Sequence, residues 1–263
     1  MGAVSLDISG HTAHVTLSHA GKFNAMSRAM WRELRAVFEG LQHSAVRCVV
    51  LQGTHGHFCA GGDISEYADF RFQEASLRDF HENEVWGGLQ AMLNCDVPIV
   101  ASIDGNCMGA GLEMASCCDL RLAATTARFG APIARLGFPM APREAALVAC
   151  AVGELTAREL LLTAAVLDAA EMKQRGFLNR VCAPMELAGA VQDLSERIGS
   201  LAPAAARQNK QIFRSNQPLA QALLNGSATD LVACPSADAY RYADSAEHRE
   251  GVTAFIDKRV PVF

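Results

Sequence analysis

The sequence predicts an α/β fold in which mostly parallel strands are joined by helices. Strand-like runs alternate with segments of helical period through the first half of the chain, and glycine-rich loops follow two of the buried runs. Half of the 263 residues are hydrophobic and only 19% are charged, which is enough apolar surface for a large core. The length fits one large domain or two small ones. Parallel strands connected by right-handed helical crossovers are therefore expected.

The first elements follow from local pattern. Residues 4–8 and 14–17 are short β-type runs around Ser9-Gly10-His11, which predicts a hairpin with the glycine in its turn. Ser27 has the character of an N-cap, and apolar residues recur at helical spacing after it. This helix leads into a buried strand at residues 48–51. A glycine-rich loop (53–62), an amphipathic helix (77–93) and another buried strand (99–103) come next.

From about Ala141 onward the pattern becomes one helix after another. Expected helices span residues 144–151, 156–162, 169–175, 185–198, 203–213 and 245–258. Only residues 178–182 look like a strand in this half. No linker or internal repeat divides the chain, so we expect the helical part to pack on the α/β core or on neighbouring subunits.

Composition excludes several classes of protein. A formal net charge of −5 gives no basic field for nucleic acid or anionic lipid, so a small ligand is the better expectation. The nine cysteines are odd in number and form no C-x-x-C pair, which argues against a disulfide framework and a zinc site. They are interpreted as reduced thiols of a cytoplasmic protein. No secretory signal or membrane-spanning apolar stretch is seen.

Two glycine-rich segments, residues 58–64 and 105–113, follow strand ends. Small residues let main-chain N–H groups approach a ligand closely. In the second segment a helix is expected to begin near Ala110, where unpaired amides and the positive end of the helix dipole favour negative charge. One donor from each loop would form an oxyanion hole. For either loop taken alone, a tight turn is the commoner explanation, and it is the joint pattern of the two loops that favours a site.

Glu113 is the acidic residue at the end of the second segment. It falls in the first turn of the expected helix, and mostly apolar residues follow it. Its carboxyl is therefore either a surface group that complements the helix dipole or a buried acid/base. Nucleotide-binding glycine motifs, a G-x-S-x-G elbow and metal-binding histidine spacings are not matched.

The two loops resemble the paired signatures of the crotonase (enoyl-CoA hydratase/isomerase) superfamily. The resemblance extends over nearly the whole chain and is carried by these segments: Asn24-Ala25-Met26, Phe58-Cys59-Ala60-Gly61-Gly62-Asp63-Ile64, Asp104-Gly105, Gly109-Ala110-Gly111-Leu112-Glu113, Cys118-Asp119-Leu120, Phe129-Gly130, Pro132, Leu136-Gly137, Gly176-Phe177-Leu178-Asn179-Arg180-Val181 and Glu250-Gly251-Val252-Thr253-Ala254-Phe255 with Lys258. It implies a crotonase/ClpP-like spiral of ββα units over residues 1–195 and a helical C-terminal trimerisation region over 196–263. It also implies trimers or dimers of trimers and an acyl-CoA substrate, with no cofactor besides the coenzyme A of that substrate.

Functional residues follow from the same resemblance. The amides of Gly62 and Ala110 would hold the thioester oxygen, where an enolate-like intermediate places its charge, and Glu113 would be the acid/base. The remaining matched positions would contact coenzyme A, and the last two of them often do so from a neighbouring subunit: Asn24, Ala25, Ala60, Asp63, Ile64, Phe255 and Lys258. For Phe255 helix packing, and for Lys258 a solvated cation at a helix end, are the structural alternatives.

One departure from the family pattern bears on the reaction. Family hydratases use two glutamates, and Ile133 occupies the position of the second, while Ala141 stands where dienoyl isomerases carry an aspartate. Three hypotheses remain: a hydratase/isomerase-type enzyme that relies on Glu113, another crotonase-type reaction such as decarboxylation of a malonyl-type thioester, and a catalytically silent acyl-CoA binder or assembly subunit.

Overall fold

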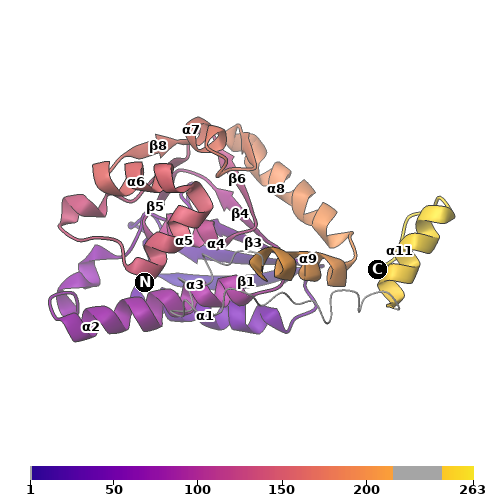
Figure 1. The fold of residues 1–263 in the computed structure, drawn as a ribbon, viewed down its shortest axis with the longest axis horizontal. Coiled ribbons are helices and arrows are strands. Elements are labelled where there is room, and N and C mark those ends of the chain that lie inside the picture. The colour runs from indigo at the N-terminus through magenta and orange to yellow at the C-terminus, as the bar shows by residue number, and fades with distance from the viewer. Residues whose placement is uncertain (1, 216–244) are drawn as a thin grey trace.

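The computed structural model describes residues 2–215 and 245–263 (Figure 1). A six-stranded sheet in the order β1-β2-β3-β4-β6-β9 is its centre. The β1–β2 pair is an antiparallel hairpin and the other neighbours are parallel. The strands are β1 (Ala3–Ser9), β2 (Thr12–Ser18), β3 (Cys48–Gly53), β4 (Ile99–Ile103), β6 (Leu120–Ala124) and β9 (Arg180–Cys182).

A smaller sheet of three short strands lies beside it, with the order β5-β7-β8. Its strands are β5 (Asn106–Met108), β7 (Arg128–Gly130) and β8 (Val166–Asp168). Two isolated bridges, Met26 to Gly62 and Cys59 to Cys107, tie the first glycine loop to its neighbours. Both loops are therefore held by backbone pairing.

Helices surround the sheets in the order of the chain. They are α1 (Arg28–Gln42), the 3₁₀ turn η1 (Ile64–Asp69), α2 (Glu74–Asp79), the π-helical turn η2 (Phe80–Val85), α3 (Trp86–Asn94), α4 (Ala110–Cys117), the 3₁₀ turn η3 (Pro132–Leu136), α5 (Pro142–Val152), α6 (Glu154–Thr163), α7 (Ala169–Gln174), α8 (Pro184–Gly199), α9 (Pro203–Ser215) and α11 (Ala246–Ile256). The Ser27 hydroxyl caps α1 by accepting from the Met30 amide, as the sequence predicts.

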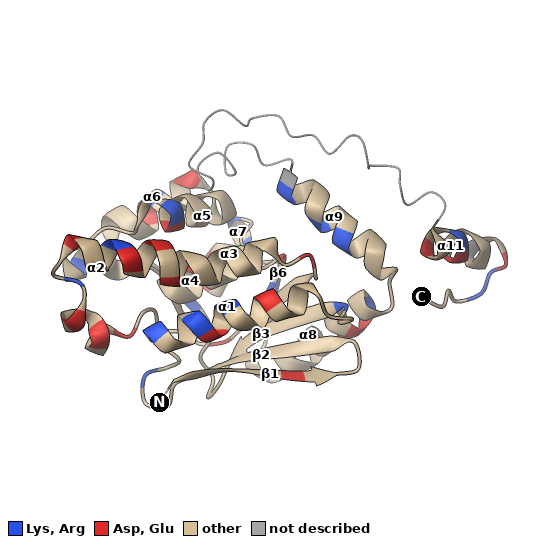
Figure 2. Cartoon of the chain, turned by 90° about the horizontal axis from the view of Figure 1, so that it is seen from below, with Lys and Arg blue, Asp and Glu red and all other residues tan. Residues whose placement is uncertain are grey.

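The parallel strands are buried on both faces. On β3, Val49 and Leu51 face the main core together with the apolar sides of α1 and α3. Cys48 and Val50 face the other way, toward a second cluster that α8 covers. This arrangement explains why β3 is apolar without alternation. Figure 2 shows charged residues of both signs along the helices, while β2 and β3 carry none.

Most of the expected elements are present, with three differences. Residues 166–168 form β8, so the prediction of a single strand after Ala141 was wrong. A three-residue strand is too short to show a period, and β8 exists through its antiparallel pairing with β7. The strand expected at 178–182 is shorter, and the expected 77–93 helix starts earlier and contains the π-helical turn.

The C-terminal end makes few contacts with the core. Figure 1 shows α11 set apart from the body of the molecule. The Ala204 amide donates to Glu247, and Arg47 donates to the main-chain oxygen of Phe263. No helix within residues 2–215 and 245–263 is long and apolar enough to cross a membrane. The described cysteines are free, and all of them but Cys150 are buried; Cys234 lies outside the described residues.

Candidate active site

A cavity of about 200 Å³ lies where the two glycine loops meet η1, η2 and the start of α5. It brings together residues from distant parts of the sequence. Those that matter most for its chemistry are Gly62, Tyr67, Arg71, His81, Ala110, Glu113, Ile133 and Glu144. The three residues that the sequence predicts as an oxyanion hole and an acid/base thus share one cavity.

The Gly62 amide is left unpaired by the local backbone. Met26 donates to the oxygen of Gly61 at 2.8 Å, and Asp63 donates to the oxygen of Met26 at 2.8 Å. The two hydrogen bonds of this parallel bridge use the Gly61 oxygen and the Asp63 N–H, which lie before and after the Gly62 N–H in the chain. That N–H has no acceptor among the described residues. A Cβ at Gly62 would stand 2.4 Å from the Tyr67 hydroxyl, so the ring of Tyr67 lies directly against this position.

Ala110 is the first residue of α4, and its N–H also lacks an acceptor in the part of the chain that the structure describes. Gly109 precedes it with φ 47° and ψ −110°, a conformation that glycine adopts readily. Gly111 packs so closely that a Cβ there would lie 2.6 Å from the main-chain oxygen of Cys59. The glycines of this segment therefore bring the start of α4 against the first loop.

Glu113 is buried, with 6% of its surface exposed. Its amide donates to the oxygen of Gly109 at 3.0 Å, and its carboxyl has no hydrogen-bond partner among the described residues. Burial, and secondarily the nearby Glu144 carboxyl, raises the pKa of Glu113 well above its ordinary value. Glu113 therefore lies in the environment of a buried acid/base and not in that of a surface group that complements the helix dipole.

Sequence reasoning missed a group of polar residues in the same cavity. Glu144, in the first turn of α5, is 3% exposed and accepts from His81 Nδ1 at 2.8 Å. Nη1 of Arg71 lies 3.5 Å from His81 Nε2. The Arg71 guanidinium also stacks on the rings of Phe138, at 3.7 Å, and Tyr67, at 4.5 Å, measured to their centroids. A carboxylate just after Pro142 was the available signal, but nothing in the sequence places it opposite Glu113.

Ile133 lines the cavity from η3. An aliphatic side chain has no donor or acceptor, so this position supplies no proton-transfer group. Ile133, which departs from the family pattern in the sequence, therefore also lines the candidate active site.

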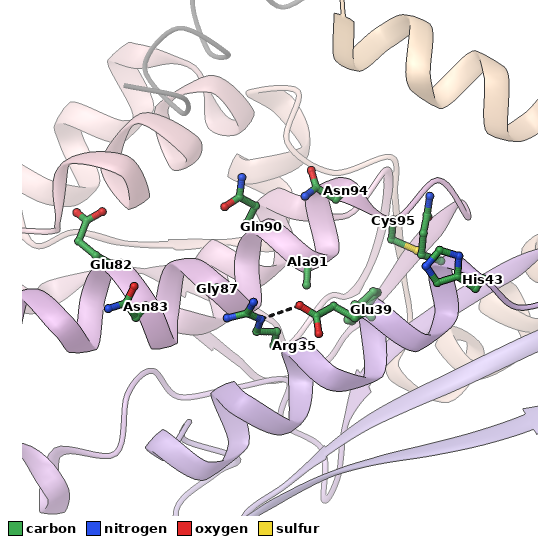
Figure 3. Close-up of a pocket in the computed structure, with 12 residues that line it drawn as sticks. Arg35, Glu39, His43, Glu82, Asn83, Gly87, Gln90, Ala91, Asn94 and Cys95 are labelled. Carbon is green, nitrogen blue, oxygen red and sulfur yellow. Dashed lines mark hydrogen bonds and ion pairs between the residues drawn. The ribbon is translucent and has the colours of Figure 1, made fainter. Parts of the chain in front are cut away.

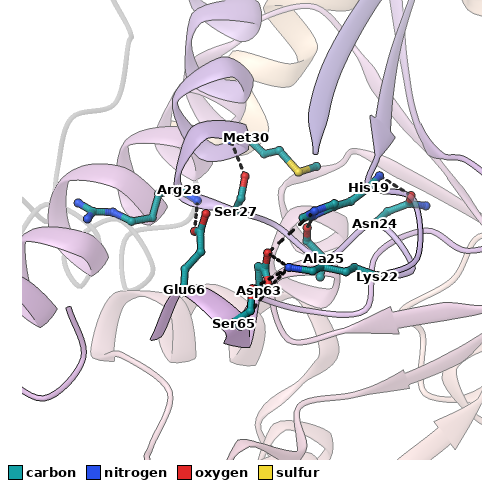
Figure 4. Close-up of polar contacts among 10 residues, drawn as sticks. All are labelled: His19, Lys22, Asn24, Ala25, Ser27, Arg28, Met30, Asp63, Ser65 and Glu66. Carbon is teal, nitrogen blue, oxygen red and sulfur yellow. Dashed lines mark hydrogen bonds and ion pairs between the residues drawn. The ribbon is translucent and has the colours of Figure 1, made fainter. Parts of the chain in front are cut away.

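Asn24 and Asp63 make internal contacts (Figure 4). The Asn24 side chain accepts from the His19 amide and donates to the main-chain oxygens of Thr54 and His57, so it joins three loops. Asp63 accepts from Lys22 Nζ at 2.6 and 2.8 Å.

Burial raises the pKa of Asp63, but hydrogen bonds from Lys22 and Ser65 outweigh burial and hold that pKa below its ordinary value. The Asn24 and Asp63 side chains therefore stabilise the loop that carries Gly62.

The other expected coenzyme A contacts are spread more widely. Ala60 lines the cavity, as does Ile64, whose side chain is 56% exposed at its edge. Ala25 is buried, and its oxygen contacts His19 Nδ1. Phe255 lies in α11, with its side chain outside the described part, and Lys258 is exposed just after that helix. Lys258 is not among the described residues that line the cavity of this single chain.

A larger cavity of about 370 Å³ lies between α1 and α3 (Figure 3). Charged and amide side chains line it, including the Arg35–Glu39 ion pair at 2.7 Å, in which both side chains are exposed. The unpaired amides of Gly62 and Ala110 and the buried carboxyls of Glu113 and Glu144 belong to residues that line the smaller cavity, which is therefore the candidate active site. Within the described residues, no three His, Cys, Asp or Glu side chains gather in a way that could hold a metal ion.

Comparison with known proteins shows the family to which the chain belongs. Residues 7–263 match the family model for enoyl-CoA hydratase/isomerase. The probable enoyl-CoA hydratase of Rhizobium meliloti is 31% identical over 98% of this chain and 96% of its own length. The short-chain-enoyl-CoA hydratase of Clostridium acetobutylicum is 28% identical over 97% of this chain and 95% of its own.

The fold agrees as well. The crystal structure of an enoyl-CoA hydratase/carnithine racemase from Magnetospirillum magneticum superposes with a TM-score of 0.91 and 31% identity, covering 100% of this chain and 96% of the other. The chain therefore belongs to the enoyl-CoA hydratase/isomerase family of enzymes and has the crotonase fold, as its motifs indicate.

Proposed function

We propose that this protein is an acyl-CoA enzyme of the hydratase/isomerase type. In this proposal the amides of Gly62 and Ala110 hold the oxygen of a thioester, and Glu113 transfers a proton at the carbon beside it. The observation that carries the proposal is that two unpaired amides from separate loops and one buried carboxyl face the same cavity. The short-chain-enoyl-CoA hydratase named above supports a small 2-enoyl thioester as the substrate.

The chemistry follows from where charge develops. Addition of water to a 2-enoyl thioester, or movement of its double bond, passes through an enolate whose charge lies on the thioester oxygen. Fixed N–H donors in a buried site stabilise that charge without reorganising, and removal of one such donor typically costs roughly 10²- to 10³-fold in rate. The raised pKa of Glu113 keeps its proton available near neutral pH, as a general acid requires.

Binding of the coenzyme A portion is assigned to the loop around Asn24 and Ala25, to Ala60, and to the segment of Asp63 and Ile64. Because the Asn24 and Asp63 side chains are engaged internally, their contribution in this proposal comes through the backbone. We assign Phe255 and Lys258 to the nucleotide end of the ligand, reached from a neighbouring subunit of a trimer or hexamer.

The test is turnover of short 2-enoyl-CoA thioesters by the wild type and by Glu113→Gln. We expect the variant to lose about 10²- to 10⁴-fold in kcat, because it keeps the shape of the side chain and loses the transferable proton. Unchanged kcat in Glu113→Gln would remove Glu113 from the mechanism. The apolar side chain of Ile133 favours a second candidate reaction, decarboxylation of a malonyl-type thioester, and carbon dioxide release in the same substrate panel would identify it.

A further inference from the structure

Glu144 is a second buried carboxyl in the candidate active site, and it comes from an element that the family motifs do not mark. It lies in the first turn of α5 and lines the same cavity as Glu113, on α4. Its side chain is 4% exposed. A carboxyl so deeply buried needs a partner, and it has one in His81, whose Nδ1 lies 2.8 Å from Oε1.

The tautomer of His81 follows from its two neighbours. Nη1 of Arg71, which can only donate, faces Nε2 at 3.5 Å, so Nε2 is the acceptor nitrogen of the ring. The ring proton is then on Nδ1 and is donated to Oε1 of Glu144. Arg71, His81 and Glu144 form a chain in which each group orients the next.

The two carboxyls of the cavity thus have opposite surroundings. Glu144 is paired with a hydrogen-bond donor that has an arginine behind it, while Glu113 has no hydrogen-bond partner in the described residues. The charge of Glu144 also adds to the effect of burial in raising the pKa of Glu113. Surroundings that differ in this way assign one carboxyl as the base and the other as the acid.

Resting on the proposed function, we propose that Glu144 is the second acid/base residue of this site, oriented by His81, and that it replaces the group absent at Ile133. In hydration, Glu144 takes a proton from water as the oxygen of that water bonds to the β-carbon. The electron pair of the double bond moves to the thioester oxygen at the Gly62 and Ala110 amides. Collapse of this enolate takes the Glu113 proton onto the α-carbon, and exchange with solvent restores both carboxyls.

The location of His81 adds a second observation. It is in η2, the π-helical turn that interrupts the helix between α2 and α3. Such turns occur frequently at functional sites because they redirect side chains that a regular helix would place elsewhere. His81 is accordingly a positioning residue, which acts through Glu144.

The experiment measures hydration of a short 2-enoyl-CoA by Glu144→Gln, with Glu154→Gln as the matched control. Glu154 is an exposed glutamate at the start of α6, paired with Arg158. We expect kcat to fall about 10²- to 10⁴-fold in Glu144→Gln and to stay unchanged in the control. Calorimetric affinity for a saturated acyl-CoA should change by less than about threefold, because the ligand is still bound.

Exchange of the α-protons of that saturated thioester with deuterium oxide separates the two carboxyls. It needs only the amides and the ionised form of Glu113, which takes an α-proton and returns a deuteron after exchange with solvent, so Glu144→Gln should retain it while Glu113→Gln loses it. Equal hydration by Glu144→Gln and Glu154→Gln, with Glu113→Gln inactive, overturns the role of Glu144 and leaves the proposed function standing. A wild-type protein that hydrates no thioester overturns both proposals.

If Glu144→Gln does not fold, two variants of His81 test the same proposal. His81→Phe removes the donor to Glu144, whereas His81→Asn offers an amide N–H near the place of Nδ1. We expect His81→Phe to lower kcat roughly 10- to 100-fold with little change in KM, and His81→Asn to recover most of that loss. Equal kcat values for the two variants, or an effect on KM alone, would contradict the positioning role.

Discussion

At the residue scale, the same side-chain types have different roles because their surroundings differ. Hydrogen bonds from Lys22 and Ser65 hold the pKa of Asp63 below its ordinary value, whereas burial raises the pKa of Glu113 well above its own. Tyr67 lies against Gly62, and its pKa is raised chiefly by burial, so its hydroxyl stays a donor beside the unpaired amide. The chemistry of the cavity is therefore set by local dielectric and hydrogen bonding more than by residue identity.

Because the Glu113 carboxyl is buried, we expect the free energy of unfolding to depend on pH. In the unfolded chain its pKa is near 4.5, and in the folded chain it is well above that. Its contribution to stability is complete below the unfolded value and is lost as pH rises through the folded value, because the folded state must hold a proton that the unfolded chain releases.

Glu113→Gln removes this loss. We expect the free energy of unfolding to fall less between about pH 5 and about pH 8 in the variant than in the wild type, with each unit of pKa difference accounting for roughly 1.4 kcal/mol. Urea unfolding at both pH values measures it, with Glu154→Gln as the exposed control. Parallel pH dependences in all three proteins would show that Glu113 ionises in the folded protein as it does in the unfolded chain.

At the scale of elements, the start of α4 is positioned by close packing against the first glycine loop. The Cys59 amide donates to the oxygen of Asn106 at 2.8 Å, and the Met108 amide donates to the oxygen of Cys59 at 2.9 Å. Gly109 donates to the oxygen of Gly130 at 2.8 Å. The two loops can therefore bring their free amides to one place only if no Cβ separates them. Gly111 is where the space is smallest on the α4 side.

Gly111→Ala tests this packing. The added Cβ would meet the main-chain oxygen of Cys59 at 2.6 Å, which a side-chain rotation cannot relieve. We expect a loss of about 1 to 3 kcal/mol in unfolding free energy, together with a lower kcat, as the Ala110 amide shifts. Gly189→Ala is the control, since open space surrounds that helical glycine and alanine should gain up to about 1 kcal/mol there. A Gly111→Ala protein as stable and active as the wild type would show that the approach of the two segments is not tight.

At the scale of the whole molecule, the described residues that line the cavity all fall within residues 31–144. Exposed apolar side chains on α9 and near α11, among them Phe213 and Val260, are the kind of surface that subunits cover. This supports the proposal that the C-terminal region completes the coenzyme A site of a neighbouring subunit in a trimer or hexamer. We expect a solution mass of three or six times 28.1 kDa by light scattering.

Lys258→Ala tests that assignment. Lost contact with a phosphate of the nucleotide should raise KM for an enoyl-CoA about fivefold, equivalent to about 1 kcal/mol, with kcat little changed. The matching enoyl-pantetheine thioester, which lacks the nucleotide, should show no difference between variant and wild type. An equal rise in KM for both substrates would indicate a disturbed site in place of a lost phosphate contact.

The sequence by itself determined the elements whose signals are local, and the motifs. The Ser27 cap, the alternation that builds the parallel sheet and the glycines that need small side chains are readable from neighbours in the chain. Family resemblance then indicated Gly62, Ala110 and Glu113, and the structure brings these three to one cavity.

Which residues share the cavity with Glu113 became apparent only from the folded chain. Position 133 holds isoleucine, and the carboxyl that shares the cavity comes from α5 with a histidine from η2. Glu144 and His81 are 63 residues apart, and neither has a local pattern that marks a partner. The short strand β8 likewise depends on pairing with β7. Long-range contacts of this kind are fixed by how the elements pack, because burial and pairing energies belong to the assembled fold and not to any one segment.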